Sequence, residues 1–73
     1  MSVIQHNIMS ALLRFPYGLT TEELIERVYH GAREPDWAKA VIYVGVHRLN
    51  RTLKGVEIRF SRSRKRAYQL WFT

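Results

Sequence analysis

In two segments near the end of the chain, every second residue has a large apolar side chain. This alternation limits the possible folds more than any other feature. Residues 56–60 read VEIRF and residues 67–72 read AYQLWF. A period of two is typical of a strand that has one face on a core, so the segments predict a β-hairpin. Its tip, residues 61–66, reads SRSRKR and contains four cationic side chains: Arg62, Arg64, Lys65 and Arg66.

The positive charge of the chain is concentrated around this hairpin. Residues 1–47 contain four Lys or Arg and five Asp or Glu, whereas residues 48–73 contain eight Lys or Arg and one Glu. Like charges repel one another, so a cluster of them at a hairpin tip points to an anionic partner outside the chain. The alternative is a solvated charge run that only keeps the protein soluble.

Two amphipathic segments at the start of the chain predict helices. Ser2 with Gln5 fits a capping box, and apolar residues recur at helical spacing as far as Phe15, where Pro16 ends the pattern. Thr20 with Glu23 forms a second capping box. A hydrophobic staple of Leu19 and Leu24 and a C-cap at Gly31 complete the second helix.

The longest predicted helix runs from about Trp37 to Leu53, with Asp36 as N-cap and Gly55 beyond its end. At 100° per residue, one face is apolar and predicts the core contact. This face consists of Ala38, Ile42, Gly45, Val46, Leu49 and Leu53. The opposite face consists of Ala40, Val44, His47, Arg48 and Arg51.

These elements predict an α+β fold in which three helices precede a two-stranded hairpin, as in a winged helix-turn-helix domain. With 73 residues, we expect one domain covering residues 1–73. The absence of cysteine, of a membrane-length apolar run and of a signal-peptide pattern suggests a cytoplasmic, nucleoid-associated protein without membrane contact. No catalytic triad, phosphate loop or metal-ligand spacing is present, so we expect neither an enzyme nor a cofactor.

From Leu19 to Leu70 the chain resembles the DNA-binding effector domain of OmpR/PhoB-type response regulators. In VIYVGVHRLNRTLKG, the residues that fit the recognition helix of that family are Val44, Val46, Arg48, Leu49 and Leu53. In RKRAYQL, the residues that fit its wing are Arg64, Tyr68 and Leu70. The chain departs from the family at Asn50, which replaces a common arginine, and at Lys65 and Ala67, which replace the wing glycines.

The resemblance implies a transcriptional regulator. The chain departs from the family in having no receiver domain, so we expect a stand-alone winged helix, and its small size suggests a phage-like protein. Its third helix is expected in the major groove of double-stranded DNA and its basic wing on the minor groove or the phosphates. Arg48 is the first candidate for base reading, and Arg64 is the first candidate for the minor groove. The other candidate DNA contacts are Lys39, Tyr43, Val44, His47, Asn50, Arg51, Arg62, Lys65 and Arg66.

The sequence is also compatible with two other functions, and it allows two roles for each of two aromatic side chains. The same fold can dock on an acidic protein surface, and a basic hairpin can bind nucleic acid without reading its sequence. Trp37 and Trp71 either pack against the small core or contact a partner. Because one small domain offers few base contacts, a homodimer or a DNA-bound protein partner is also expected.

Overall fold

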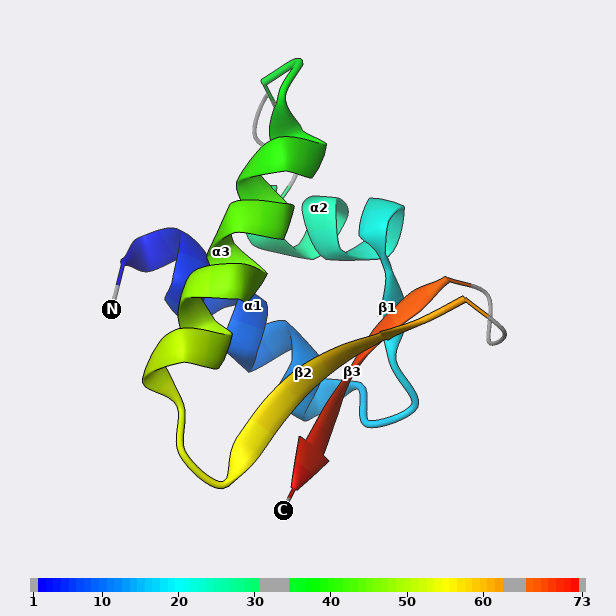
Figure 1. Cartoon of the computed structure of the whole chain (residues 1–73). Coiled ribbons are helices and arrows are strands. Elements are labelled where there is room, and N and C mark those ends of the chain that lie inside the picture. The colour runs from blue at the N-terminus through cyan, green and yellow to red at the C-terminus, as the bar shows by residue number, and fades with distance from the viewer. Residues whose placement is uncertain (1, 31–34, 63–65, 73) are drawn as a thin grey trace.

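The chain folds into three helices and a small antiparallel sheet, described by a computed structural model for residues 2–30, 35–62 and 66–72 (Figure 1). The element order is α1 (Val3–Arg14), β1 (Leu19–Thr20), α2 (Thr21–Tyr29), α3 (Ala38–Thr52), β2 (Val56–Ser61) and β3 (Ala67–Phe72). This confirms the α+β class. The predicted two-stranded sheet is wrong, however, because the described strands form a three-stranded sheet in the order β1-β3-β2.

The extra strand, β1, consists of two residues that the sequence assigns to the start of the second helix, Leu19 in its hydrophobic staple and Thr20 in its capping box. Leu19 pairs with Tyr68 and Thr20 pairs with Ala67, both antiparallel. Two residues are too few to display a period of two, so the pattern that reveals β2 and β3 cannot reveal β1. The turn before it depends on Gly18, which has φ +98 and whose Cβ, if present, would lie 3.0 Å from the Tyr68 carbonyl oxygen.

The first two helices begin where their sequences predict, and the full capping box is found at α2. The Gln5 N–H donates to the Ser2 hydroxyl over 3.1 Å, which caps α1. The capping box of α2 is complete, since the Glu23 N–H donates to Thr20 Oγ1 over 3.1 Å and the Thr20 N–H donates to Glu23 Oε1 over 2.9 Å. α2 ends at His30, which adopts the left-handed conformation with φ 50; the predicted C-cap Gly31 lies outside the described residues.

The third helix begins one residue later than predicted, and its predicted N-cap is wrong. Trp37, not Asp36, is the N-cap of α3, and no side chain caps the helix. The Ala38 N–H donates to the Pro35 carbonyl over 3.1 Å, so Asp36 lies within a turn that precedes the helix. At its other end α3 stops at Thr52, and Gly55 turns the chain into β2 with φ +79.

The core lies between the helices and one face of the sheet. Each helix contributes the apolar face that its periodicity predicts, and the predicted core residues of α3 are buried apart from Leu53, which is half-buried. Trp37 and Trp71 do not belong to the buried cluster; their exposed fractions are 66% and 47%. The buried hydrophobic residues are Ile8, Ala11, Leu12, Leu19, Leu24, Ile25, Val28, Ala38, Ile42, Val46, Leu49, Ile58, Ala67 and Tyr68.

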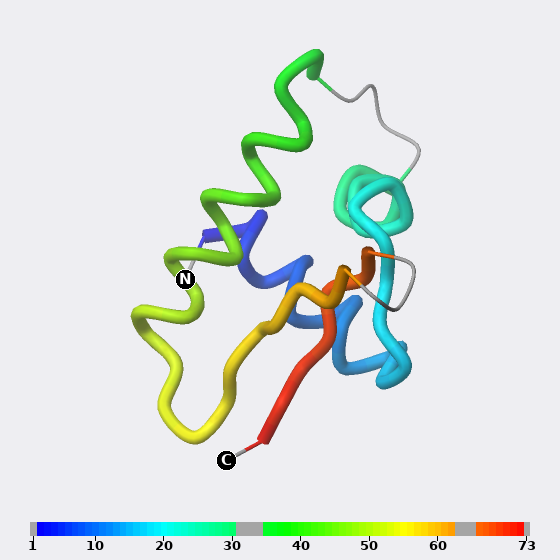
Figure 2. Tube along the Cα trace, turned by 45° about the vertical axis from the view of Figure 1, so that its right-hand side comes forward, coloured from blue at the N-terminus to red at the C-terminus, as the bar shows by residue number. Residues whose placement is uncertain are grey.

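The arrangement of α3 and the hairpin positions the candidate site. Both strands are six residues long, and their register runs from Val56 opposite Phe72 to Ser61 opposite Ala67. α3 and β2 leave the turn at residues 53–55 in diverging directions, as two views show (Figures 1 and 2). One side of α3 therefore faces neither α1 nor α2, and the end of the hairpin lies away from that turn.

Candidate nucleic-acid interface

The outward side of α3 presents five of the predicted contact residues to solvent. Tyr43, Val44, His47, Arg48 and Arg51 are all exposed. Helical spacing places Arg51 most nearly opposite the buried Ile42–Leu49 face, with Val44 and His47 on either side of it, while Tyr43 lies towards the sheet and Arg48 towards α1. The outward side of α3 is therefore mixed, with two arginines, a histidine and two apolar or aromatic groups.

Arg48 lies at the edge of this surface rather than in its middle. With Val44 it lines a groove of about 340 Å³ against the start of α1, where Ser2, Ile4 and Gln5 form the other wall. The sequence predicts Arg48 as the principal base-reading residue, but helical spacing places Arg51 further outward than Arg48. Arg48 remains exposed and keeps its full set of donors.

Tyr43 and His47 face the hairpin across a cleft of about 390 Å³, which we call the α3–β2 cleft. It brings together residues of α3, both hairpin strands and the basic end of the hairpin. Arg62 is the member from that basic end, and it follows directly on the last residue of β2. The cleft is lined by Tyr43, Val46, His47, Asn50, Ile58, Phe60, Arg62 and Tyr68.

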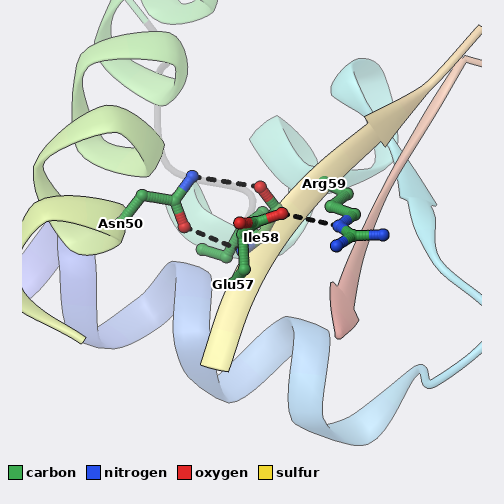
Figure 3. A network of polar contacts seen from close by, with 4 residues as sticks. All are labelled: Asn50, Glu57, Ile58 and Arg59. Carbon is green, nitrogen blue, oxygen red and sulfur yellow. Dashed lines mark hydrogen bonds and ion pairs between the residues drawn. The ribbon is translucent and has the colours of Figure 1, made fainter. Parts of the chain in front are cut away.

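Asn50 is held by the protein's own backbone and not directed at a ligand (Figure 3). Its amide nitrogen donates to the Ile58 carbonyl over 3.0 Å, and the Ile58 N–H donates to its Oδ1 over 2.8 Å. A side-chain amide reads adenine with both its oxygen and its nitrogen. Because both atoms already bond Ile58, Asn50 is a weaker candidate for a base contact than its neighbours on α3.

Two further basic residues have partners within the chain. Lys39 Nζ lies 3.5 Å from Glu22 Oε1, and both side chains are largely exposed. Such a pair contributes little, so it does not prevent Lys39 from contacting a phosphate. Arg59 donates to Glu57 over 2.5 Å and stacks over the Trp71 ring at 4.7 Å, on the sheet face away from the helices.

At the hairpin end, the structure describes two of the four predicted cationic contacts. Arg62 and Arg66 are exposed. Arg66 has φ 53, so the chain enters β3 through a left-handed residue. Arg64 and Lys65 lie outside the described residues.

Sequence reasoning missed two aromatic residues of the cleft. Alternation along β2 and β3 placed Phe60 and Tyr68 on the core face, which is correct, yet Phe60 is 43% exposed. Its ring lies 4.9 Å from the Tyr68 ring, with an angle of 56° between the planes. The period of two gives the face of a residue but not how far the helix opposite covers it, so no sequence signal predicted this exposure.

Burial raises the pKa of Tyr68 above its ordinary value of 10.0, and the neighbouring Tyr43 adds to this effect. A hydrogen bond with Thr21 acts in the opposite direction. The Tyr68 hydroxyl is therefore neutral at physiological pH and adds no charge to the cleft.

Within residues 2–30, 35–62 and 66–72, no group of three or more His, Cys, Asp or Glu side chains could hold a metal ion. In the same residues, no helix has the length and apolar character needed to cross a membrane.

Comparison with protein-family models, with curated proteins and with solved structures gave no match to this chain. The likeness to OmpR/PhoB-type effector domains therefore stays a prediction that depends on the residues quoted for it.

Proposed function

We propose that the protein is a small transcriptional regulator that binds double-stranded DNA and that its fold is a winged helix-turn-helix. In this proposal α3 enters the major groove and the basic hairpin end, residues 61–66, contacts the adjacent minor groove or its phosphates. The observation that carries the proposal is the position of Arg62. It shares one cleft with Tyr43 and His47 of α3, so helix and hairpin offer one continuous surface.

The dimensions and chemistry of this surface suit a duplex. The major groove is about 12 Å wide and admits one α-helix, and the 15 residues of α3 leave one side uncovered by α1, α2 or the sheet. His47 and Arg51 are the candidates for base edges, and Val44 for a thymine methyl group. Arg48, Arg62 and Arg66 are the candidates for phosphates, which fix the register on the duplex.

The proposal is tested by fluorescence anisotropy with a random-sequence duplex over a salt series. For four to six phosphate contacts, log K should fall against log[salt] with a slope of about −4 to −5. The variant Arg62→Ala/Arg66→Ala should reduce the slope by about 2, because each lost phosphate contact removes about 0.9. Adding Arg64→Ala and Lys65→Ala should reduce it further.

A matched control separates contact from total charge. Arg14→Ala/Arg27→Ala removes the same number of charges from a hollow between α1 and α2 that contains no residue of α3 or the sheet. It should leave the slope almost unchanged. Equal slope losses in both double variants would show that only net charge matters, and no binding at low salt would overturn the proposal in favour of an acidic protein partner.

Sequence reading is tested separately on α3, after a preferred site has been selected. His47→Ala and Arg51→Ala should weaken the preferred site about 5- to 100-fold, as loss of a base contact does, and weaken random duplexes much less. Equal weakening on all duplexes would instead assign the protein to sequence-neutral binding.

A further inference from the structure

We infer that the α3–β2 cleft binds one unpaired nucleobase, so that the protein prefers DNA containing an unstacked base to a fully paired duplex. This inference depends on the proposed function, because it concerns the same nucleic-acid surface. It adds a ligand that neither a major-groove helix nor a phosphate-binding hairpin requires.

The walls of the cleft are mainly apolar and aromatic. Five of its eight lining residues are Tyr43, Val46, Ile58, Phe60 and Tyr68. The Tyr43 side chain is 67% exposed and the Phe60 side chain 43% exposed. Phe60 lies against Tyr68, which holds its ring from one side. Two aromatic groups that are open to solvent beside cations are what single-stranded nucleic-acid binding proteins use to stack bases.

The polar groups of the cleft stand where a base edge could meet them. His47 and Arg62 come from opposite walls, one from α3 and one from the hairpin end. Both can donate hydrogen bonds to base oxygens and nitrogens. Asn50 has its amide atoms bonded to Ile58 and closes the cleft at one end without serving a ligand.

A base fits these walls better than the other candidate occupants. A phosphate requires several donors and gains nothing from apolar walls, whereas only two of the lining side chains, His47 and Arg62, have free donors that could carry a positive charge. The side chains of an acidic peptide have the same disadvantage. A nucleobase presents an aromatic face and a polar edge, and its phosphates would extend towards the basic residues outside the cleft, Arg51 and Arg66. The cleft volume of about 390 Å³ lies in the range of small-ligand sites.

The energetic consequence is a preference among DNA forms. A base must leave the stack before it can enter the cleft, and extrusion costs least where the base is already unpaired. Stacking on an aromatic side chain then strengthens binding. A perfectly paired duplex would leave the cleft empty, while a duplex with one unpaired thymine would fill it.

The test compares three fluorescein-labelled DNAs of equal length at one salt concentration: a paired duplex, the same duplex with one unpaired thymine, and the single strand. The unpaired thymine should increase affinity about tenfold or more over the paired duplex. Tyr43→Ala and Phe60→Leu should remove most of this gain. Tyr43 is largely exposed and Phe60→Leu keeps an apolar side chain, so both variants should fold.

Tyr17→Ala is the matched control, because this tyrosine is 94% exposed and does not line the cleft. It should keep the full gain. A second readout replaces the unpaired thymine by 5-iodouracil and maps the photo-crosslink by mass spectrometry; Tyr43 or Phe60 should be the crosslinked residue.

Equal affinity for paired and unpaired duplexes, or a crosslink only outside the cleft, would overturn the inference and leave the proposed function intact. Failure of all three DNAs to bind would overturn both. A gain that survives Tyr43→Ala and Phe60→Leu would show that the unpaired base is bound elsewhere, which also overturns the inference.

Discussion

The Asn50 side chain makes the hydrogen bonds to β2 that a neighbouring strand would otherwise make. β2 is at the edge of the sheet, and its Ile58 pairs with Leu70 of β3. Both the N–H and the C=O of Ile58 bond the Asn50 side chain, so they are directed away from β3. Unpaired edge groups invite association with other strands. The Asn50 amide thus provides hydrogen-bond partners for the backbone groups in the middle of the edge strand β2. It also fixes the distance between α3 and β2.

Replacing this side chain should destabilise the fold and leave DNA binding intact. Asn50→Ala removes two hydrogen bonds, and we expect the free energy of unfolding in urea to fall by about 1–3 kcal/mol. Arg51→Ala, on the exposed side of the same helix, should change it by no more than about 0.5 kcal/mol. Unchanged stability of Asn50→Ala combined with a loss of DNA affinity would restore Asn50 as a DNA contact.

Tyr68 should make the protein sensitive to alkaline pH. Burial raises its pKa in the folded state above the 10.0 expected for the unfolded chain. Between these two values the unfolded state loses its proton first, so stability is fully present below pH 10 and falls as pH rises through that window.

Tyr68→Phe should therefore flatten the decline in unfolding free energy above pH 10, measured by urea unfolding at a series of pH values. Tyr17→Phe, at a nearly fully exposed position, should leave the decline as steep as in the unaltered protein. An equal effect of the two substitutions would show that burial of Tyr68 is not the cause.

At the scale of elements, the close approach of α1 and α3 depends on Gly45. A Cβ at this position would lie 2.7 Å from the Cδ1 atom of Ile8, whose side chain is fully buried. Glycine normally weakens a helix interior by about 1 kcal/mol relative to alanine. Here the missing side chain leaves room for the Ile8 Cδ1 atom, so two opposing effects act on any substitution.

We expect the steric effect to prevail in Gly45→Ala, because added volume in a packed core costs about 1–3 kcal/mol. Ile8→Val removes the Cδ1 atom and alone should cost about 0.5–1.5 kcal/mol. The double variant should be more stable than the sum of the single effects predicts, by at least 0.5 kcal/mol in thermal or urea unfolding. Additive effects would mean that the two side chains do not collide.

The elements also show what sequence alone could predict. Helical and period-two spacing located every long element, and the capping box of α2 was readable because Thr20 and Glu23 are three residues apart. The two-residue β1 and the N-cap of α3 were not predictable, because both depend on tertiary contacts: the pairing of Leu19 with Tyr68 and the turn that starts at Pro35.

At the scale of the whole molecule, the fold brings Arg62, from the basic end of the hairpin, into one cleft with residues of α3. The types of contact residue were predictable, since charge and helical position can be read directly from the sequence. Their arrangement was not, because it depends on the angle at which β2 leaves α3 (Figure 2). In the folded chain α3 and the hairpin line the α3–β2 cleft, Phe60 is partly exposed within it, and the Asn50 side chain links α3 to β2.

The central claim is that α3 and the hairpin bind DNA as one surface, and an NMR titration of the ¹⁵N-labelled protein with a duplex tests it most directly. The account predicts amide shift changes or broadening at Tyr43, His47, Arg51, Arg62 and Arg66. Resonances of Arg14, Arg27 and the Trp71 indole, on other parts of the molecule, should stay in place. Changes centred on Trp71 or on the α1–α2 hollow, with α3 unaffected, would contradict the account.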